Sequence, residues 1–345
     1  MTSIDGCVHP RPASESELRE FMAKPWSEYP FSKIGEHPLA LEFSEQSSET
    51  TVASLRKEVL TKEGHDYAVL VPLTRGLMAD SALNSELASG TNRWLASKYL
   101  TDAANADSRL FGSIRVNPND VDAACREIDA WKDDPQMVQV VVSSQSHVPY
   151  GDRGYWKIWE KAADAGLPVA VLSDRSSGIE FNPSAAGPVR TSAEWYAARG
   201  LNFVYHLTSC VGSGVFEAIP GLKFVFLDGG YEAYDGVRWK LDLGWRTARA
   251  ESPWVSHEPT RLLAKRVWFC WDELGYQSGG DYPGPMTESE WDGELFYGSH
   301  YPEPGMGSTN APSLFSSLTE PLASQIRAKA GDLYSRIPAK TAATA

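Results

Sequence analysis

The stretch Glu294-Leu-Phe-Tyr-Gly-Ser-His-Tyr-Pro-Glu303 joins a short apolar run to a polar tip. The run at 295–298 is bounded by Gly and Pro, which is typical of a strand buried in a parallel sheet. His300 stands at the carboxyl end of that strand, where barrel enzymes place their chemistry. The alternative is a histidine that only hydrogen-bonds a loop, and the rest of the chain has to decide between the two.

Further apolar segments of strand length precede this one, and helical patterns lie between most of them. Such alternation indicates right-handed β–α–β units and a parallel sheet, and eight strands favour a closed (β/α)8 TIM barrel of the α/β class. An open doubly wound sheet is the alternative, although no Gly-rich phosphate loop follows the first strand. The eight predicted strands cover residues 4–9, 66–72, 110–116, 137–143, 168–173, 223–228, 266–271 and 295–299.

The region between the first two strands, 13–60, is polar and contains prolines that block long helices. We expect an extended loop there, with one short helix near 15–23. The segment 201–218 is either one helix or a strand followed by a helix, because Gly212 and Gly214 interrupt its pattern. Other helices are expected at 82–104, 119–131 with an Asn cap, 155–165, 192–200, 231–245 and 312–334.

The composition is that of a globular protein, with 345 residues, 42% hydrophobic and 22% charged. We expect one barrel domain over 1–338 and a frayed tail over 339–345. The formal net charge of −13 argues against a nucleic-acid or membrane partner. The sequence has no transmembrane run and no signal-peptide pattern, and its four scattered cysteines predict a reducing, cytoplasmic location.

Polar residues at the strand ends come together in a barrel, because the carboxyl ends of all strands meet at one mouth. His9 and His300 follow the first and last strands, which are neighbours in a closed barrel, and Asp228 follows the sixth. A His–Asp–His set can act as acid and base, or can hold a divalent metal. We therefore expect His300, Asp228 and His9 to be catalytic, and the same three to be the ligands if a metal binds, with Cys7 as the alternative to Asp228.

The predicted substrate-binding residues lie at the same mouth: Arg175, Arg115, Asp174, Tyr301 and Cys7. The two arginines could clamp a carboxylate, and Asp174 could orient His300. Each assignment has an alternative. Arg175 could pair with Asp174 on the surface, Cys7 could be a small core residue, and Asp228 could cap the turn that follows it. For His206, in a helical segment, packing or a hydrogen bond is the expected role.

Three segments together resemble a known family: Ile4-Asp-Gly-Cys-Val-His-Pro10, residues 214–230 and Phe296-Tyr-Gly-Ser-His-Tyr-Pro302. They are similar to the amidohydrolase-2 family, typified by aminocarboxymuconate-semialdehyde decarboxylase, over about residues 4–304 in the family's order and spacing. The resemblance implies a (β/α)8 barrel, usually with one zinc or similar divalent ion. It also implies decarboxylation, hydration or hydrolysis of small, often aromatic or unsaturated acids, and commonly a homodimer.

The family's usual metal ligands are replaced at most positions. Cys7-x-His9 stands in place of His-x-His, and Leu172 takes the place of the histidine that ends the fifth strand. Asp228 replaces the usual histidine before Gly-Gly, and His300 replaces the aspartate of Gly-Ser-Asp-Tyr-Pro. Because leucine has no lone pair to offer, the resemblance favours a site without a tightly bound metal, although zinc or a similar ion remains conceivable.

Three functions remain open on the sequence alone. The first is a metal-independent enzyme that uses His300, Asp228 and His9 as acid and base on a small organic acid, by decarboxylation, hydrolysis or a lyase or cyclisation step. The second is a metal-dependent hydrolase or decarboxylase with a rearranged site. The third is a binding protein that kept the barrel and lost its chemistry, which is ranked last because the polar residues are exchanged rather than lost.

Overall fold

The structure is a computed structural model that describes residues 2–28, 50–173, 191, 194, 198, 200–271, 294–302 and 320–339. Its centre is an eight-stranded sheet whose strands follow the order of the chain, each paired in parallel with the next. The strands are β1 (Ile4–Val8), β2 (Tyr67–Leu70), β3 (Leu110–Arg115), β4 (Met137–Ser143), β5 (Val169–Leu172), β6 (Phe224–Phe226), β7 (Val267–Trp271) and β8 (Leu295–Tyr297). All eight predicted strands are confirmed.

The first and last strands close the sheet into a barrel. The N–H of His300 donates to the carbonyl of Cys7 at 2.8 Å, and the N–H of His9 donates to the carbonyl of Tyr301 at 2.8 Å. These bonds lie just beyond the carboxyl end of β8, so the β1–β8 seam is joined at the mouth of the barrel. The expected TIM barrel is therefore confirmed, and the open-sheet alternative is wrong.

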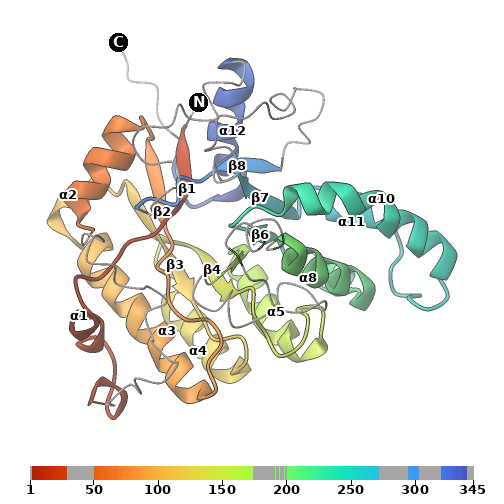
Figure 1. Cartoon of the computed structure of the whole chain (residues 1–345), viewed down its shortest axis with the longest axis horizontal. Coiled ribbons are helices and arrows are strands. Elements are labelled where there is room, and N and C mark those ends of the chain that lie inside the picture. The colour runs from red at the N-terminus through yellow and green to blue at the C-terminus, as the bar shows by residue number, and fades with distance from the viewer. Residues whose placement is uncertain are drawn as a thin grey trace.

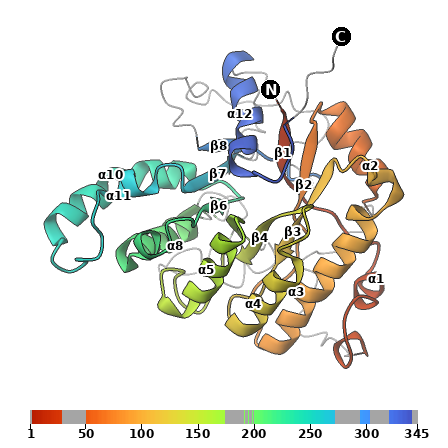
Figure 2. The same cartoon turned by 180° about the vertical axis from the view of Figure 1, so that it is seen from behind.

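The helices pack around the strands, with α3, α4 and α5 on one side of the barrel and α8, α10 and α11 on another (Figure 1). Figure 2 shows α10 and α11 extending away from the sheet. The helices are α1 (Glu15–Arg19), α2 (Val52–Leu55), α3 (Ser81–Leu95), α4 (Val121–Trp131), α5 (Trp156–Asp164), α8 (Gly200–Ser213), α9 (Val215–Ala218), α10 (Tyr231–Ala248), α11 (Pro259–Leu263) and α12 (Glu320–Leu333).

The helix predictions hold at most positions, with three differences. Residues 201–218 form two helices and no strand, and Gly214, at φ 78°, separates α8 from α9. The cap of α4 is Asp120, which accepts from the N–H of Ala123, and not the expected asparagine. Residues 52–62 are helical where we expected loop, because Thr51 and Ser54 form a capping box and apolar side chains follow at helical spacing.

The end of the barrel at which the strands begin is closed by α12. Side chains from the end of α12 and just beyond it belong to the apolar cluster that fills the barrel. Tyr334 reaches Gln139 on β4, and donates to its Oε1 at 2.9 Å, while Gln139 donates to Ser113 on β3. Among the described residues, these side chains therefore fill the barrel interior beneath the strand ends that carry the polar groups.

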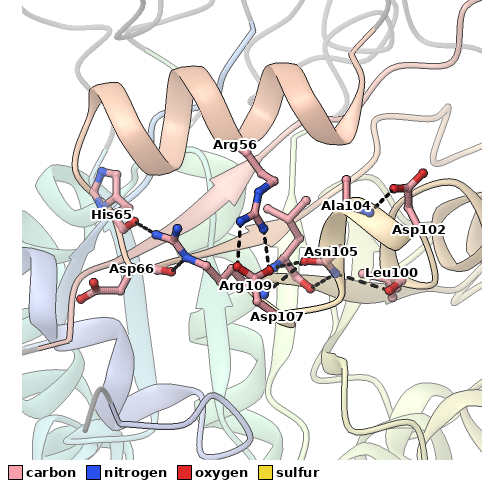
Figure 3. Close-up of polar contacts among 10 residues, drawn as sticks. Arg56, His65, Asp66, Leu100, Asp102, Ala104, Asn105, Asp107 and Arg109 are labelled. Atoms are coloured by element: carbon pink, nitrogen blue, oxygen red, sulfur yellow. Dashed lines mark hydrogen bonds and ion pairs between the residues drawn. The ribbon is translucent and has the colours of Figure 1, made fainter. Parts of the chain in front are cut away.

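A polar network ties α2 and its continuation to the start of β2 and β3 (Figure 3). Arg109 donates to the carbonyls of His65 and Asp66, both at 2.8 Å, just before β2. Arg56 forms a two-pronged ion pair with Asp107, at 2.5 and 2.7 Å. These contacts fix the loops on the side opposite the mouth, so their role is structural.

Some expectations lie outside the described residues. These are most of the predicted helix at 192–200, the part of the first loop at 29–49, the first residues of the predicted last helix, and residues 340–345 of the tail. Among the helices that the structure describes, none is both long and apolar enough to cross a membrane.

Candidate active site

Two histidines meet at the seam between β1 and β8. Nε2 of His9 lies 3.0 Å from Nδ1 of His300, and the two rings are tilted by 47° with their centroids 5.1 Å apart. Both side chains are buried, and His300 has 0% exposure. His300 also has a left-handed backbone, with φ 53°, which is uncommon outside glycine and is often found at functional sites.

The hydrogen bond made by Nδ1 of His9 fixes the tautomer of its ring. Nδ1 of His9 lies 2.8 Å from the carbonyl oxygen of Val71, and a carbonyl can only accept a hydrogen bond. Nδ1 therefore carries the proton. In the neutral ring, Nε2 then offers its lone pair toward His300, and can accept a proton or bind a metal there.

Cys7 completes a three-membered cluster with these histidines. Its sulfur lies 3.7 Å from Nε2 of His9 and 3.6 Å from Nδ1 of His300, and the three donor atoms all lie within 4.8 Å of one another. Burial, together with the neighbouring Cys270, raises the pKa of the Cys7 thiol well above its usual value. Cys7 thus lies in the site, as predicted, and remains a neutral thiol unless a cation is bound beside it.

Gly298 leaves the space that lets these side chains approach. A Cβ at Gly298 would lie 2.3 Å from the sulfur of Cys270 and 2.8 Å from Cβ of Cys7. The sulfur of Cys270 lies 3.9 Å from Nε2 of His300, which is the nitrogen that faces away from His9. Cys270 was not among the predicted site residues, because a cysteine inside an apolar strand gives no signal that separates it from the core.

Asp228 lies beside the cluster, at the carboxyl end of β6. Its Oδ1 is 3.7 Å from Nδ1 of His300, and its Oδ2 accepts from the N–H of Ser173 at 2.6 Å. The carboxylate is buried. The backbone donor at the end of β5 holds it in place, so it can stabilise positive charge on His300.

Asp5 ties the two halves of the seam together. Its Oδ1 accepts from the N–H of Ser299 at 3.0 Å and from the N–H of Cys7 at 3.2 Å, at an irregularity in the pairing of β1. Burial raises the pKa of Asp5 to about 7, against the opposing effect of these hydrogen bonds. Since its contacts flank both His300 and Cys7, Asp5 positions the site, a role that sequence analysis missed.

The remaining predicted residues differ in their surroundings. Arg115 is buried and donates to the carbonyls of Thr74, at 2.6 Å, and Pro72, at 3.5 Å, so that it holds the loop after β2. The ring of Tyr301 packs against the core, and partial burial raises its pKa. Asp174 and Arg175 lie outside the described residues.

The structure adds polar groups at the mouth that were not predicted as site residues. Thr74 and Gln145, on the loops after β2 and β4, are buried, and their Oγ1 and Oε1 have no hydrogen-bond partner among the described residues. Arg11 and Arg75 are buried on the loops after β1 and β2. The position of Arg11, two residues after His9, could have indicated that it lies near the site. A single arginine is usually exposed, however, so the sequence did not distinguish Arg11 from a surface residue.

The structure also places two other histidines. His206 lies in α8, where it contacts the carbonyl oxygen of Ser144 at 2.7 Å and stacks on Tyr150, so its expected packing role is confirmed. His65 lies in the loop before β2, where it is buried, stacked on Tyr297 and 2.9 Å from Oγ of Ser3.

The three donors fit a divalent ion by their spacing. On a tetrahedral zinc ion, with Zn–N of about 2.0–2.1 Å and Zn–S of about 2.3 Å, two nitrogens lie about 3.3 Å apart, and sulfur and nitrogen about 3.6 Å. The observed separations are 3.0, 3.6 and 3.7 Å. Leu172 is part of the apolar interior and offers no ligand, so any ion would be held from the β1–β8 seam.

The molecule is a (β/α)8 barrel with a polar mouth. Imidazole, thiol and carboxylate groups gather there, at the carboxyl ends of the strands. The chain belongs to the amidohydrolase family, whose pattern matches residues 66–289. This confirms the resemblance seen in the sequence. Comparison with curated proteins gave no match.

Several solved structures are similar over almost the whole chain. An amidohydrolase from Mycobacterium avium subsp. paratuberculosis is 17% identical, with a TM-score of 0.66 over 96% of this chain and 97% of that one. The 5-carboxyvanillate decarboxylase of Sphingomonas paucimobilis is 17% identical, with a TM-score of 0.67 over 97% and 99%. A dihydroxybenzoic acid decarboxylase from Polaromonas, with bound manganese and the inhibitor 2-nitroresorcinol, is 18% identical, with a TM-score of 0.66 over 97% of both. At these identities the likeness shows the fold.

Proposed function

We propose that this protein is an enzyme that decarboxylates a small organic acid, aromatic or unsaturated. The observation that carries the proposal is the convergence of His9, His300, Asp228 and Cys7, all buried, at the carboxyl ends of the barrel strands. Membership of the amidohydrolase family supports an enzyme, and two of the similar structures are decarboxylases of aromatic acids. Hydrolysis and other lyase or cyclisation steps are the alternatives from the sequence.

Decarboxylation requires a proton at the carbon that loses the carboxylate. The C–C bond to the carboxylate breaks, carbon dioxide leaves, and the electron pair left on carbon takes a proton. His300 is the residue to which we assign this proton, because its ring lies at the mouth and Asp228 can stabilise the charged imidazolium. His9, held by Val71, is the second proton carrier through its contact with His300.

Two forms of this chemistry use the same side chains. In the metal-free form, which the sequence favoured, His9 and His300 pass a proton between Nε2 and Nδ1. In the metal-assisted form, those two nitrogens and the Cys7 sulfur hold a divalent ion such as zinc, and the spacing of the three donors favours this form. An ion bound there would act as a Lewis acid toward an oxygen of the substrate. Because His300 would then hold the ion through Nδ1, the proton for the carbon would come from the carboxyl group of Asp228, which lies beside the site.

Substrate recognition needs cationic groups for a carboxylate. Arg115 and Arg175, which we proposed from the sequence, remain candidates together with Asp174 and Tyr301. The buried Arg11 and Arg75 are further candidates, since a guanidinium binds a carboxylate with two parallel hydrogen bonds. We also carry forward a cytoplasmic location and a homodimer as proposals, and for the homodimer we place Trp239 and Leu243 at the interface, because both are exposed on one face of α10.

The test is turnover of a panel of hydroxybenzoic acids, including 2,6-dihydroxybenzoate and 5-carboxyvanillate, by the protein as purified, after chelation, and after reloading with zinc. We expect release of carbon dioxide in step with loss of the acid. Activity that survives chelation would assign the metal-free form, and activity restored only by zinc would assign the metal-assisted form. Hydrolysis of an ester or amide substrate without release of carbon dioxide, or tight binding of acids without turnover, would overturn decarboxylation.

A further inference from the structure

We propose that Cys7, His9 and His300 form a mixed thiolate–imidazole metal site that selects zinc or cobalt over manganese or magnesium. The inference rests on the metal-assisted form of the proposed function and specifies its ligands and its ion. The ligand set expected from the sequence was His9, His300 and Asp228, with Cys7 as the alternative to Asp228, and the proposal commits to the Cys7 sulfur as the third donor.

The geometry of the donors points to one ion between them. The three atom pairs differ from the edges of a tetrahedral site by about 0.3 Å or less. All three side chains are buried and come from the two strands that close the barrel. Because the N–H of His300 donates to the carbonyl of Cys7, and that of His9 to the carbonyl of Tyr301, the strands carrying the ligands are fixed relative to each other.

The hydrogen bond of His9 to a residue outside the ligand set also supports a metal site. Nδ1 of His9 is directed at the carbonyl oxygen of Val71, which leaves Nε2 as the donor that faces Cys7 and His300. Metal-binding histidines commonly donate their other N–H to a carbonyl or carboxylate, which fixes the ring and its tautomer. A histidine with only a packing role does not require its lone pair to be aimed at a thiol and a second imidazole.

Three protein ligands are the number found in catalytic zinc sites, which keep the fourth position for water or substrate. Cys270 is not counted as a ligand, because it does not belong to the cluster of donor atoms that lie within 4.8 Å of one another. Asp228, with Oδ1 3.7 Å from Nδ1 of His300, borders the site as a neighbouring carboxylate. Among the described residues, the donor count is therefore that of a catalytic centre.

The thiolate decides which ion is preferred. Cysteine sulfur and imidazole nitrogen suit zinc and cobalt, whereas manganese and magnesium favour carboxylate, carbonyl and water oxygens. One soft anionic ligand with two imidazoles thus separates this site from one that holds manganese through oxygen. The manganese bound in the Polaromonas decarboxylase gives a useful reference ion for a competition experiment.

The experiment is a titration of the metal-depleted full-length protein with cobalt, followed by absorption. We expect one cobalt per chain and a near-ultraviolet thiolate-to-cobalt charge-transfer band. In Cys7→Ser the band should be lost, and cobalt should bind more weakly by at least the roughly 10- to 100-fold that loss of an outer partner causes. Cys125→Ser is the matched control, because Cys125 is a buried cysteine on α4 that donates to the carbonyl of Lys157, a bond that serine can keep.

A second measurement does not depend on a variant that folds. Wild-type protein offered equal zinc and manganese should carry zinc by elemental analysis. Cobalt binding without a charge-transfer band, equal uptake of manganese, or no stoichiometric binding would each overturn the site. If the band is present and no acid is turned over, the metal site stands and the proposed decarboxylase function fails, so the two proposals can fail separately.

Discussion

Nε2 of His9 and Nδ1 of His300 lie 3.0 Å apart although 291 positions of the chain separate the two residues. The contact exists because β1 and β8 are neighbours only in a closed barrel, and because the N–H of each histidine donates to the other strand. Chemistry at the mouth therefore depends on the seam, and the first prediction concerns the histidine that β8 places there.

Replacing His300 by Asn should lower kcat about 10²- to 10⁴-fold, the usual contribution of a positioned acid or base. In the metal-assisted form the loss has a different cause, because the substitution removes one of the three ligands. Asn fills similar space and tolerates a positive φ such as the 53° at this position, so the fold should persist. Steady-state release of carbon dioxide measures the effect, with circular dichroism to confirm the fold. His257→Asn is the control, since His257 lies on the surface next to Glu217. Near-normal turnover in His300→Asn would remove His300 from the chemistry.

The fold could be predicted almost completely, because its signal is local. Each strand is an apolar run bounded by polar or turn residues, and residues such as 137–143 and 267–271 lie within the segments expected from sequence. Where local signals were misjudged, a specific side chain was responsible. Thr51 accepts from Ser54 and starts a helix in a region interpreted as loop.

The candidate site could be predicted only in part. His9, His300, Asp228 and Cys7 were expected together because the carboxyl ends of parallel strands meet, and the structure brings them together. The contacts that could not be predicted depend on the exact register of the strands. Asp5 accepts from the N–H of Ser299, and the pairing of β1 with β2 is irregular between Asp5 and Val8; no pattern in the sequence reports either feature.

The second prediction follows from that contact. Asp5→Leu should lower the free energy of unfolding by about 2–4 kcal/mol, because the buried N–H groups of Cys7 and Ser299 lose their acceptor. Asp5→Asn keeps an acceptor oxygen, and should be the milder change. Urea unfolding of the three proteins measures the order. Equal stability of the Asn and Leu variants would show that the two hydrogen bonds do not hold the seam.

The third prediction concerns acid stability. Burial lowers the pKa of His206 from 6.5 to about 4, so between these values the unfolded chain binds a proton that the folded chain does not. Stability from this group is complete above about pH 6.5, falls as the pH falls, and is lost below about 4. The loss is about 3 kcal/mol. In His206→Gln the unfolding free energy should decline less between pH 7 and 4.

His206→Gln will change stability at neutral pH as well, since it replaces the contacts with Ser144 and Tyr150. The test therefore compares how steeply the free energy of unfolding changes with pH in the two proteins, and not its absolute value. His65, whose pKa burial lowers to about 3, adds a loss of the same sign in both proteins. An unchanged slope in His206→Gln would mean that His206 is not buried in its neutral form.

The last prediction concerns the exposed face of α10. Trp239 and Leu243 lie one helical turn apart, are 57% and 55% exposed, and sit on a helix that extends away from the barrel (Figure 2). Large exposed apolar side chains that share a face commonly mark a protein interface. If the proposed homodimer uses this face, Trp239→Glu and Leu243→Lys should each shift the protein toward monomer in light scattering at micromolar concentration.

The matched control is Val148→Glu, because Val148 is also exposed, at 43%, but lies on the loop after β4. That variant should keep the mass of the wild-type protein. Thermal unfolding of the α10 variants should depend less on protein concentration than that of wild type, since dissociation no longer accompanies unfolding. A dimer that withstands both α10 substitutions would place its interface on another face, and a wild-type monomer would remove the homodimer from the proposal.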